Sequence, residues 1–268
     1  MMDPKARLEA MKKVWDQKKK ISTNLSQIKH KVAVYSGKGG VGKTTVAVNL
    51  AVLAASKGAT VGLLDADIDC PNVLKLMKSP SSPEMVDGQI IPAVMHGVKV
   101  VSMALFQEKE DEAIIWRGPM IHNAITQFLE LTRWGDLEYL FVDLPPGTSD
   151  APLTIIQSLQ LDGFIIVTTP QEVAMMDAKR SINMVKKLNV PILGVVENMS
   201  GDIFGTGGGE QVAKETGVKY LGRIELNKAF REPPAPAVID DKKVRKQFED
   251  ILSQVEFPVK SESLNPKS

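Results

Sequence analysis

Short apolar runs alternate with stretches that favour helices along most of this 268-residue chain. The apolar runs have the length and composition of buried strands, and several of them end in a glycine or a polar residue. Strands that alternate with helices imply right-handed crossovers and a mostly parallel sheet with helices on both faces. We therefore predict an α/β fold with a single doubly wound sheet of about seven or eight strands. The predicted strands cover residues 31–37, 59–67, 98–105, 138–144, 163–170, 191–200 and 219–226, and the predicted helices cover 43–57, 119–133, 171–189, 208–216 and 240–255.

The bulk composition limits the class of protein. Hydrophobic residues make up 43% of the chain, enough for a full core, and the formal net charge of +1 gives no strong signal for nucleic-acid binding. Cys70 is the single cysteine, so a disulfide framework within the chain is excluded and a reducing compartment is favoured. No apolar run reaches the roughly 18 to 20 residues of a membrane span, and the first residues lack the apolar core of a signal peptide. These features predict a cytoplasmic protein.

The two ends of the chain differ from its middle. Residues 1–30 are predicted to form a basic amphipathic helix, because Leu8, Met11 and Trp15 recur at helical spacing among many lysines. This helix either packs on its own domain or contacts a partner or a membrane surface. We predict one main domain over residues 31–255 and a disordered tail over residues 256–268.

The stretch SGKGGVGKTT follows the first predicted strand and opens the first predicted helix. Gly37, Gly42, Lys43 and Thr44 satisfy the pattern G-x-x-x-x-G-K-[ST] of P-loop NTPases. The glycines let backbone N–H groups surround phosphate oxygens, and the helix N-terminus adds partial positive charge. Lys43 is expected to reach the β and γ phosphates, and the Thr44 hydroxyl is expected to ligate Mg²⁺. The predicted nucleotide-binding residues are Gly37, Lys38, Gly39, Gly40, Val41, Gly42, Lys43, Thr44, Thr45 and Asn198.

Polar residues at the ends of other predicted strands belong with this loop. Asp143 ends an apolar strand, where P-loop folds place a carboxylate beside Mg²⁺. In DADID, either Asp65 or Asp67 is expected to orient the attacking water. Asn198 ends another strand, and its amide either matches the N6/N7 edge of adenine or forms a turn.

Several long stretches resemble one family. KHKVAVYSGKGGVGKTTVAVNLA, DADIDCPNV, WRGPM, RWGDLEYLFVDLPPGTSDAPLT, VVENMS and FGTGGGE are similar to the Mrp/ApbC family of iron–sulfur carrier ATPases. That family groups with MinD, ParA and ArsA-type ATPases, which carry the deviant phosphate loop K-G-G-x-G-K-[ST]. The resemblance implies ATP with Mg²⁺, slow hydrolysis and a homodimer when ATP is bound.

The resemblance also assigns roles to single residues. Lys38, the early lysine of the loop, is expected to cross the dimer interface to the partner's nucleotide and neutralise charge on the γ-phosphoryl, as an arginine finger does. Asp67 is expected to position the water, and Asp65 to lie close to the Mg²⁺ shell. The expected catalytic residues are therefore Lys38, Lys43 and Asp67, and the expected Mg²⁺ site contains Thr44, Asp65 and Asp143.

This sequence departs from the family at the cargo site. The family places a C-x-x-C pair just after the ENMS segment, so that two subunits supply four thiolates, whereas this chain runs ENMSGDIFGTGGGE. A dimer of this chain offers only two Cys70 thiols, so a cluster held in the usual family manner is excluded. Three functions stay open. We favour an ATPase in iron–sulfur assembly that acts with client proteins or a cysteine-bearing relative. The alternatives are a MinD- or ParA-like positioning switch on membrane or DNA, and an ATP-gated regulatory protein.

Overall fold

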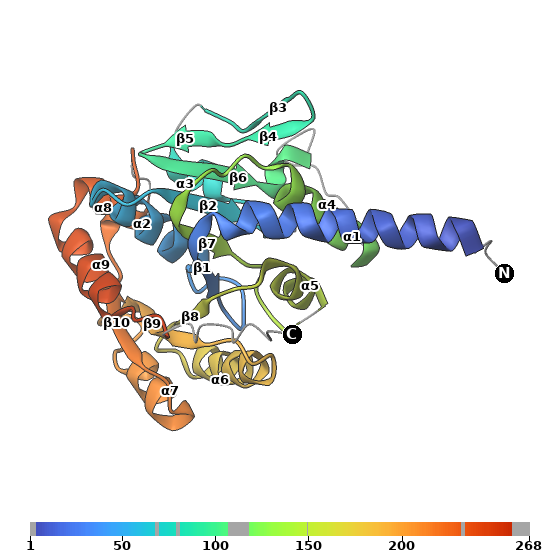
Figure 1. The fold of residues 1–268 in the computed structure, drawn as a ribbon. Helices are drawn as coiled ribbons and strands as arrows, with labels where there is room; N and C mark the ends of the chain where they lie inside the picture. Colours follow the sequence, from blue (N-terminus) through green and yellow to red (C-terminus); the bar gives the residue numbers. More distant parts are fainter. Residues whose placement is uncertain are drawn as a thin grey trace.

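The structure is a computed structural model that describes residues 4–67, 70–78, 81–106, 118–148, 150–231 and 234–258. Its centre is an eight-stranded sheet in the order β10-β9-β8-β1-β7-β2-β6-β5 (Figure 1). Every neighbouring pair in this sheet is parallel except β5 and β6. The predicted α/β fold with one mostly parallel sheet is therefore confirmed. The strands are β1 (Ile28–Tyr35), β2 (Val61–Asp65), β3 (Glu84–Val86), β4 (Gln89–Ile91), β5 (Ala93–Met95), β6 (Val98–Ser102), β7 (Leu137–Asp143), β8 (Gly163–Thr168), β9 (Ile192–Ser200) and β10 (Tyr220–Glu225).

Helices cover both faces of the sheet, and the alternation of side chains along β1 shows why. Val32 and Val34 point into an apolar cluster with α2, α3, α8 and α9, whereas Ala33 and Tyr35 point into a second cluster with α4, α5 and α6. Successive residues of a strand face opposite sides, so one apolar run supplies both cores. The helices are α1 (Pro4–Ser26), α2 (Lys43–Ser56), α3 (Val73–Met77), α4 (Gly118–Leu131), α5 (Asp150–Leu159), α6 (Glu172–Lys187), α7 (Gly208–Thr216), α8 (Ala237–Asp240) and α9 (Lys242–Gln254), with 3₁₀ turns at Met103–Phe106 and Lys228–Phe230.

Some elements were not predicted from the sequence. The antiparallel pair β3–β4 and the edge strand β5 have three residues each, too few for a periodic pattern. Helix α5 begins at Asp150, shortly after Pro145 and Pro146, and was not among the predicted helices. Within the predicted tail, Phe257 stacks on His30 with ring centroids 3.9 Å apart, while residues 259–268 lie outside the described part.

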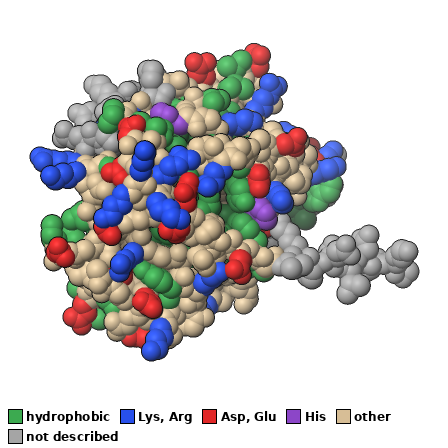
Figure 2. Space-filling model, turned by 90° about the vertical axis from the view of Figure 1, so that its left-hand side faces the viewer, with side chains coloured by type: hydrophobic (Ala, Val, Ile, Leu, Met, Phe, Trp, Pro, Cys, Tyr) green, Lys and Arg blue, Asp and Glu red, His purple; other side chains and the backbone are tan. Residues whose placement is uncertain are grey.

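The surface that carries α9 mixes both signs of charge (Figure 2). Lys246 pairs with Asp250 at 2.7 Å, and Lys243 of the same helix pairs with Glu225 at 2.5 Å. Because these charges neutralise one another locally, this face offers no single-sign patch. Among the described helices, none is both long enough and apolar enough to cross a membrane.

Candidate functional site

The phosphate loop connects β1 to α2 and ends at Gly42, the N-cap of α2, where φ is 81°. A Cβ at Gly42 would lie 2.2 Å from the Asn198 side-chain nitrogen, so both the backbone angle and the available space require glycine. The first helical hydrogen bond runs from Val46 N to Gly42 O at 3.0 Å. The N–H groups of Lys43, Thr44 and Thr45 precede that bond and have no partner within the helix. Free N–H groups at a helix N-terminus are an arrangement that suits an anion.

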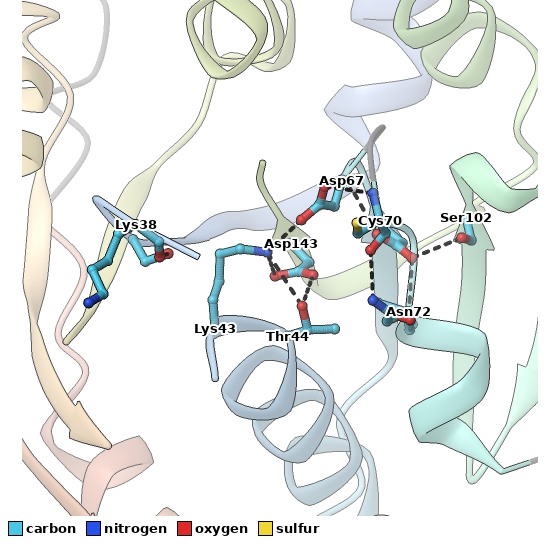
Figure 3. A network of polar contacts seen from close by, with 11 residues as sticks. Lys38, Lys43, Thr44, Asp67, Cys70, Asn72, Ser102 and Asp143 are labelled. Carbon is cyan, nitrogen blue, oxygen red and sulfur yellow. Dashed lines mark hydrogen bonds and ion pairs between the residues drawn. The ribbon is translucent and has the colours of Figure 1, made fainter. Parts of the chain in front are cut away.

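Lys43, Thr44 and Asp143 form a buried polar cluster at the mouth of this loop (Figure 3). Lys43 Nζ lies 2.6 Å from Asp143 Oδ1, and Thr44 Oγ1 donates to Asp143 Oδ2 at 2.7 Å. Burial raises the pKa of Asp143, and the charge of Lys43 opposes that rise. The cluster brings together a cation, a hydroxyl and a carboxylate, which are the groups that phosphate and a hard divalent ion require.

The sheet places a second carboxylate beside Asp143. Asp65 ends β2 and lies opposite Asp143 in the parallel register. Its Oδ1 accepts from Asp67 N at 3.2 Å, and its Oδ2 accepts from Val73 N at 3.1 Å and Ser102 Oγ at 2.9 Å. Burial, followed by the nearby charge of Asp143, raises the pKa of Asp65 to about 8. These contacts favour a role in holding the 66–73 loop, and the expected place of Asp65 in the Mg²⁺ shell stays a prediction.

Asp67 lies on the loop that Asp65 holds. Its Oδ2 is 3.5 Å from Lys43 Nζ, and its Oδ1 accepts from Cys70 N at 3.3 Å. The structure therefore brings Asp67 next to the lysine that is expected to contact the γ-phosphate. Asp69, the third acid of the DADID stretch, lies outside the described residues.

Lys38 lies apart from this cluster. Its side chain points away from Lys43 and Asp143 (Figure 3). Within the described residues no ion pair or hydrogen bond engages its Nζ, although its carbonyl accepts from Ser36 Oγ at 2.9 Å. The two lysines of the loop therefore have separate environments, and only Lys43 faces the buried carboxylates.

Asn198 contacts the phosphate loop directly. Its side chain is 4% exposed, and its Nδ2 donates to Val41 O at 2.8 Å. In this structure the amide therefore ties the end of β9 to the loop, and the predicted contact with adenine stays a prediction.

Three residues of the site were missed by the sequence analysis. Ser102 ends β6 and donates to Asp65, and Tyr35 donates to the carbonyl of Gly147 in the LPPG segment. Glu197 is fully buried and accepts hydrogen bonds from the start of α7. A polar residue at the end of an apolar run was the signal for Ser102 and Glu197, but the same signal also marks ordinary strand ends.

The turn after β9 is a tight hairpin. Gly201 N donates to Gly205 O at 2.9 Å, and Gly205 N donates to Gly201 O at 2.7 Å, with only three residues between them. None of these three is a cysteine, and Cys70 is exposed elsewhere at the carboxyl end of β2. Across the described ranges, no group of three or more His, Cys, Asp or Glu side chains is placed to hold a metal ion.

A family model described as "ParA: NUBPL iron-transfer P-loop NTPase" matches residues 27–256, which includes the phosphate loop and all strands of the sheet. The chain belongs to the NUBPL family of P-loop NTPases. This match confirms the resemblance inferred from the motifs.

Two relatives named "Iron-sulfur cluster carrier protein" are similar to this NUBPL-family chain over most of its length. The protein of Methanocaldococcus jannaschii is 47% identical, and the match covers 89% of this chain and 88% of that protein. The protein of Methanococcus maripaludis is 41% identical, and the match covers 95% of this chain and 93% of that protein.

Solved structures agree with the NUBPL-family fold. A nucleotide-binding protein from Archaeoglobus fulgidus in complex with ADP has a TM-score of 0.71 and 32% identity, covering 84% of this chain and 93% of that one. The Pyrococcus furiosus cell division ATPase MinD has a TM-score of 0.66 and 22% identity, and the match covers 84% of this chain and 98% of the MinD chain. At that identity the MinD likeness shows the fold alone.

Proposed function

We propose that this NUBPL-family protein is a slow ATP hydrolase that dimerises on ATP and acts in iron–sulfur cluster assembly or transfer without holding a four-thiolate cluster itself. The observation that carries the proposal is the Lys43–Asp143–Thr44 cluster at the N-terminus of α2, which has the groups needed for a triphosphate with Mg²⁺. The names of the relatives support the iron–sulfur setting. The single cysteine and the near-neutral charge support a cytoplasmic location without nucleic acid.

The donor set fits the nucleotide and its ion. Oxygen ligands suit Mg²⁺, and Thr44 Oγ1 and Asp143 Oδ2 are the oxygens that would hold it, together with phosphate oxygens. The ion supplies neutralisation of charge on the phosphates. Lys43 releases its hold on Asp143 and binds the β and γ phosphates, and Asp67 accepts the hydrogen bond that orients water toward the γ-phosphorus. ADP in the Archaeoglobus fulgidus relative supports an adenine nucleotide.

The dimer explains the second lysine of the loop. Since Lys38 points away from its own Lys43–Asp143 cluster, its ammonium is available to a nucleotide held by a second copy. A cation delivered from the partner links closure of the dimer to the γ-phosphate, and hydrolysis then weakens the contact.

The variant Lys38→Ala tests this role, because it should keep nucleotide binding and lose ATP-induced dimerisation and turnover. Sizing chromatography with a non-hydrolysable ATP analogue measures this, with Lys57→Ala at the end of α2 as the control. An unchanged ATP-induced dimer in Lys38→Ala would contradict the proposal.

The cargo question has a direct test. Anaerobic reconstitution with iron and sulfide should give no stable stoichiometric cluster, because two Cys70 thiols cannot replace four thiolates. Absorbance in the thiolate-to-iron region measures the outcome. A stoichiometric cluster that disappears in Cys70→Ala would show that the protein does carry one.

A further inference from the structure

Helix α1 has one face that packs on its own domain. Gln17 donates to Glu130 Oε2 at 2.9 Å, and Asn24 donates to Glu130 O at 2.8 Å on α4. The hydrogen bond from Gln17, ahead of Lys20, lowers the pKa of Glu130. Further along the helix, Leu25 is buried in the core. Residues 17, 21, 24 and 25 thus follow the helical period and define the inner face of α1.

A neighbouring face of α1, centred on Met11 and Trp15, is exposed and contains large apolar side chains. Met11 and Trp15 lie one turn apart and are each 62% exposed. Lys19 follows one turn later, with its Nζ 5.4 Å from the centroid of the Trp15 ring. Lys12 and Lys18 flank this row and are exposed as well. We call these five residues the outer stripe of α1.

The charges of the outer stripe are not neutralised within the part of the chain that the structure describes. No ion pair engages Lys12, Lys18 or Lys19 there, in contrast to Lys20, which pairs with Glu130 at 3.1 Å. The acids of the same helix, Glu9 and Asp16, lie about 100° or more around the helix from Met11 and Trp15. The stripe therefore combines an apolar centre with positive flanks.

The position of α1 makes the stripe accessible. The helix crosses α4, and its amino-terminal end extends beyond the body of the protein (Figure 1). A groove of about 1320 Å³ lies beside it, and two lysines of the stripe, Lys12 and Lys19, border this groove. The other charged groups that line it include Glu9, Asp16, Lys20 and Glu130, so charges of both signs meet there. The groove does not select one sign of charge, whereas Met11, Trp15 and Lys18 are not part of its lining and present apolar and cationic side chains to solvent.

We propose that the outer stripe of α1 binds the surface of an anionic lipid bilayer. A tryptophan on such a helix places its ring at the headgroup level, and a neighbouring methionine enters the acyl boundary. The flanking lysines keep their ammonium groups among the anionic headgroups while their methylene stems cover apolar surface. Two apolar side chains and three lysines give a weak and reversible contact.

A planar bilayer fits this surface better than a nucleic acid or a protein groove does. Binding to a phosphate backbone needs positive charge and gains little from an exposed Met11–Trp15 pair. A protein partner would need a concave site for a helix whose other face is already packed on α4. A lipid surface needs only an exposed stripe with apolar and cationic side chains, which is what α1 presents.

Vesicle flotation with the full-length protein tests the proposal. The protein should float with vesicles of phosphatidylcholine and phosphatidylglycerol, and at least tenfold less with pure phosphatidylcholine. Raising the salt from about 0.1 M to about 1 M should release most of it, because the Debye length falls from about 10 Å to about 3 Å. Two variants, Met11→Glu with Trp15→Glu, and Lys12→Gln with Lys18→Gln and Lys19→Gln, should each lower the bound fraction at least tenfold.

Matched controls separate the stripe from general surface effects. Val94→Glu changes an exposed apolar residue on β5 that is 63% exposed, and Lys242→Gln changes an exposed lysine of α9. Both should float like the unaltered protein, and thermal melting should show that all variants are folded. The proposal is overturned if the unaltered protein does not float with anionic vesicles, or if the stripe variants float equally well. Binding to duplex DNA that the lysine variant abolishes, without any flotation, would overturn it in favour of a nucleic acid.

Discussion

Two places at the carboxyl ends of the parallel strands solve the same problem, the burial of a carboxylate, in different ways. At the ends of β2 and β7, Asp65 and Asp143 share their environment with Lys43 and the Thr44 hydroxyl. Near the end of β9, Glu197 accepts from the neutral groups of Ser200, Gly207 and Gly209, and no lysine or arginine of the described ranges forms an ion pair with it. The first place holds charges that a phosphate and a metal ion can take over. The second is satisfied by hydrogen bonds from its own neighbours.

The second place depends on close backbone approach. Glu197 accepts from Ser200 Oγ at 2.7 Å, Gly207 N at 3.1 Å and Gly209 N at 2.6 Å. A Cβ at Gly209 would lie 2.7 Å from the Glu197 Cβ, so only glycine allows this contact. The carboxylate therefore holds the start of α7 and the far end of the 201–205 hairpin in one arrangement. The Lys43 cluster therefore has charged partners that a ligand can replace, whereas the hydrogen bonds of Glu197 are part of the fold itself.

The largest effect is expected when the positive charge of Lys43 is removed. Lys43→Met should weaken binding of a triphosphate by ~100-fold, about 3 kcal/mol, because the γ-phosphate loses its charged donor. Titration with a fluorescent ATP analogue measures this, and Lys242→Met on α9 is the control. If the dissociation constant of Lys43→Met for the triphosphate stayed within about threefold of that of the unaltered protein, the Lys43 cluster would not differ from the Glu197 site in ligand binding.

A smaller effect is expected at the second place. Glu197→Ala leaves the partly buried N–H of Gly207 and the buried N–H of Gly209 without their acceptor, and should lower the free energy of unfolding by about 2–4 kcal/mol. Its nucleotide affinity should change far less than that of Lys43→Met. Urea denaturation and the same titration measure both, with Glu210→Ala on the exposed side of α7 as the control. Equal losses of affinity in Glu197→Ala and Lys43→Met would show that the two places act as one.

The smallest expected effect concerns pH. The pKa of Asp65 is about 8 in the folded chain and roughly 3.9 in an unfolded one, so the folded chain binds the extra proton between these values. The stability contributed by protonated Asp65 is fully present below pH ~4 and is lost as the pH rises through about 8. In the nucleotide-free protein, Asp65→Asn should flatten this decline, since an amide imitates the neutral carboxyl. Urea melts between about pH 6 and about pH 9 measure the slope, and an unchanged slope in Asp65→Asn would contradict the assignment.

Much of the fold followed from local patterns. The apolar runs that end at Asp65, Asp143 and Asn198 predicted strands at those places, and the structure has β2, β7 and β9 there. The phosphate loop was located because its glycines and lysine have fixed spacing between a strand and a helix. The three-residue strands β3, β4 and β5 were missed because such short segments are set by their neighbours rather than by their own periodicity.

By itself, the sequence of this protein determined which residues end the strands, the position of the phosphate loop, and the absence of a second cysteine. The tertiary structure alone decided that Asp65 accepts from Ser102 and Val73, that Asn198 holds Val41, and that Met11 and Trp15 face outward on α1. The reason is physical. Strand formation depends on the side chains of a short segment, whereas the partner of a buried polar group depends on which distant strand lies beside it. Here β7 separates β1 from β2 and brings Lys43, Asp65 and Asp143 to one edge of the sheet.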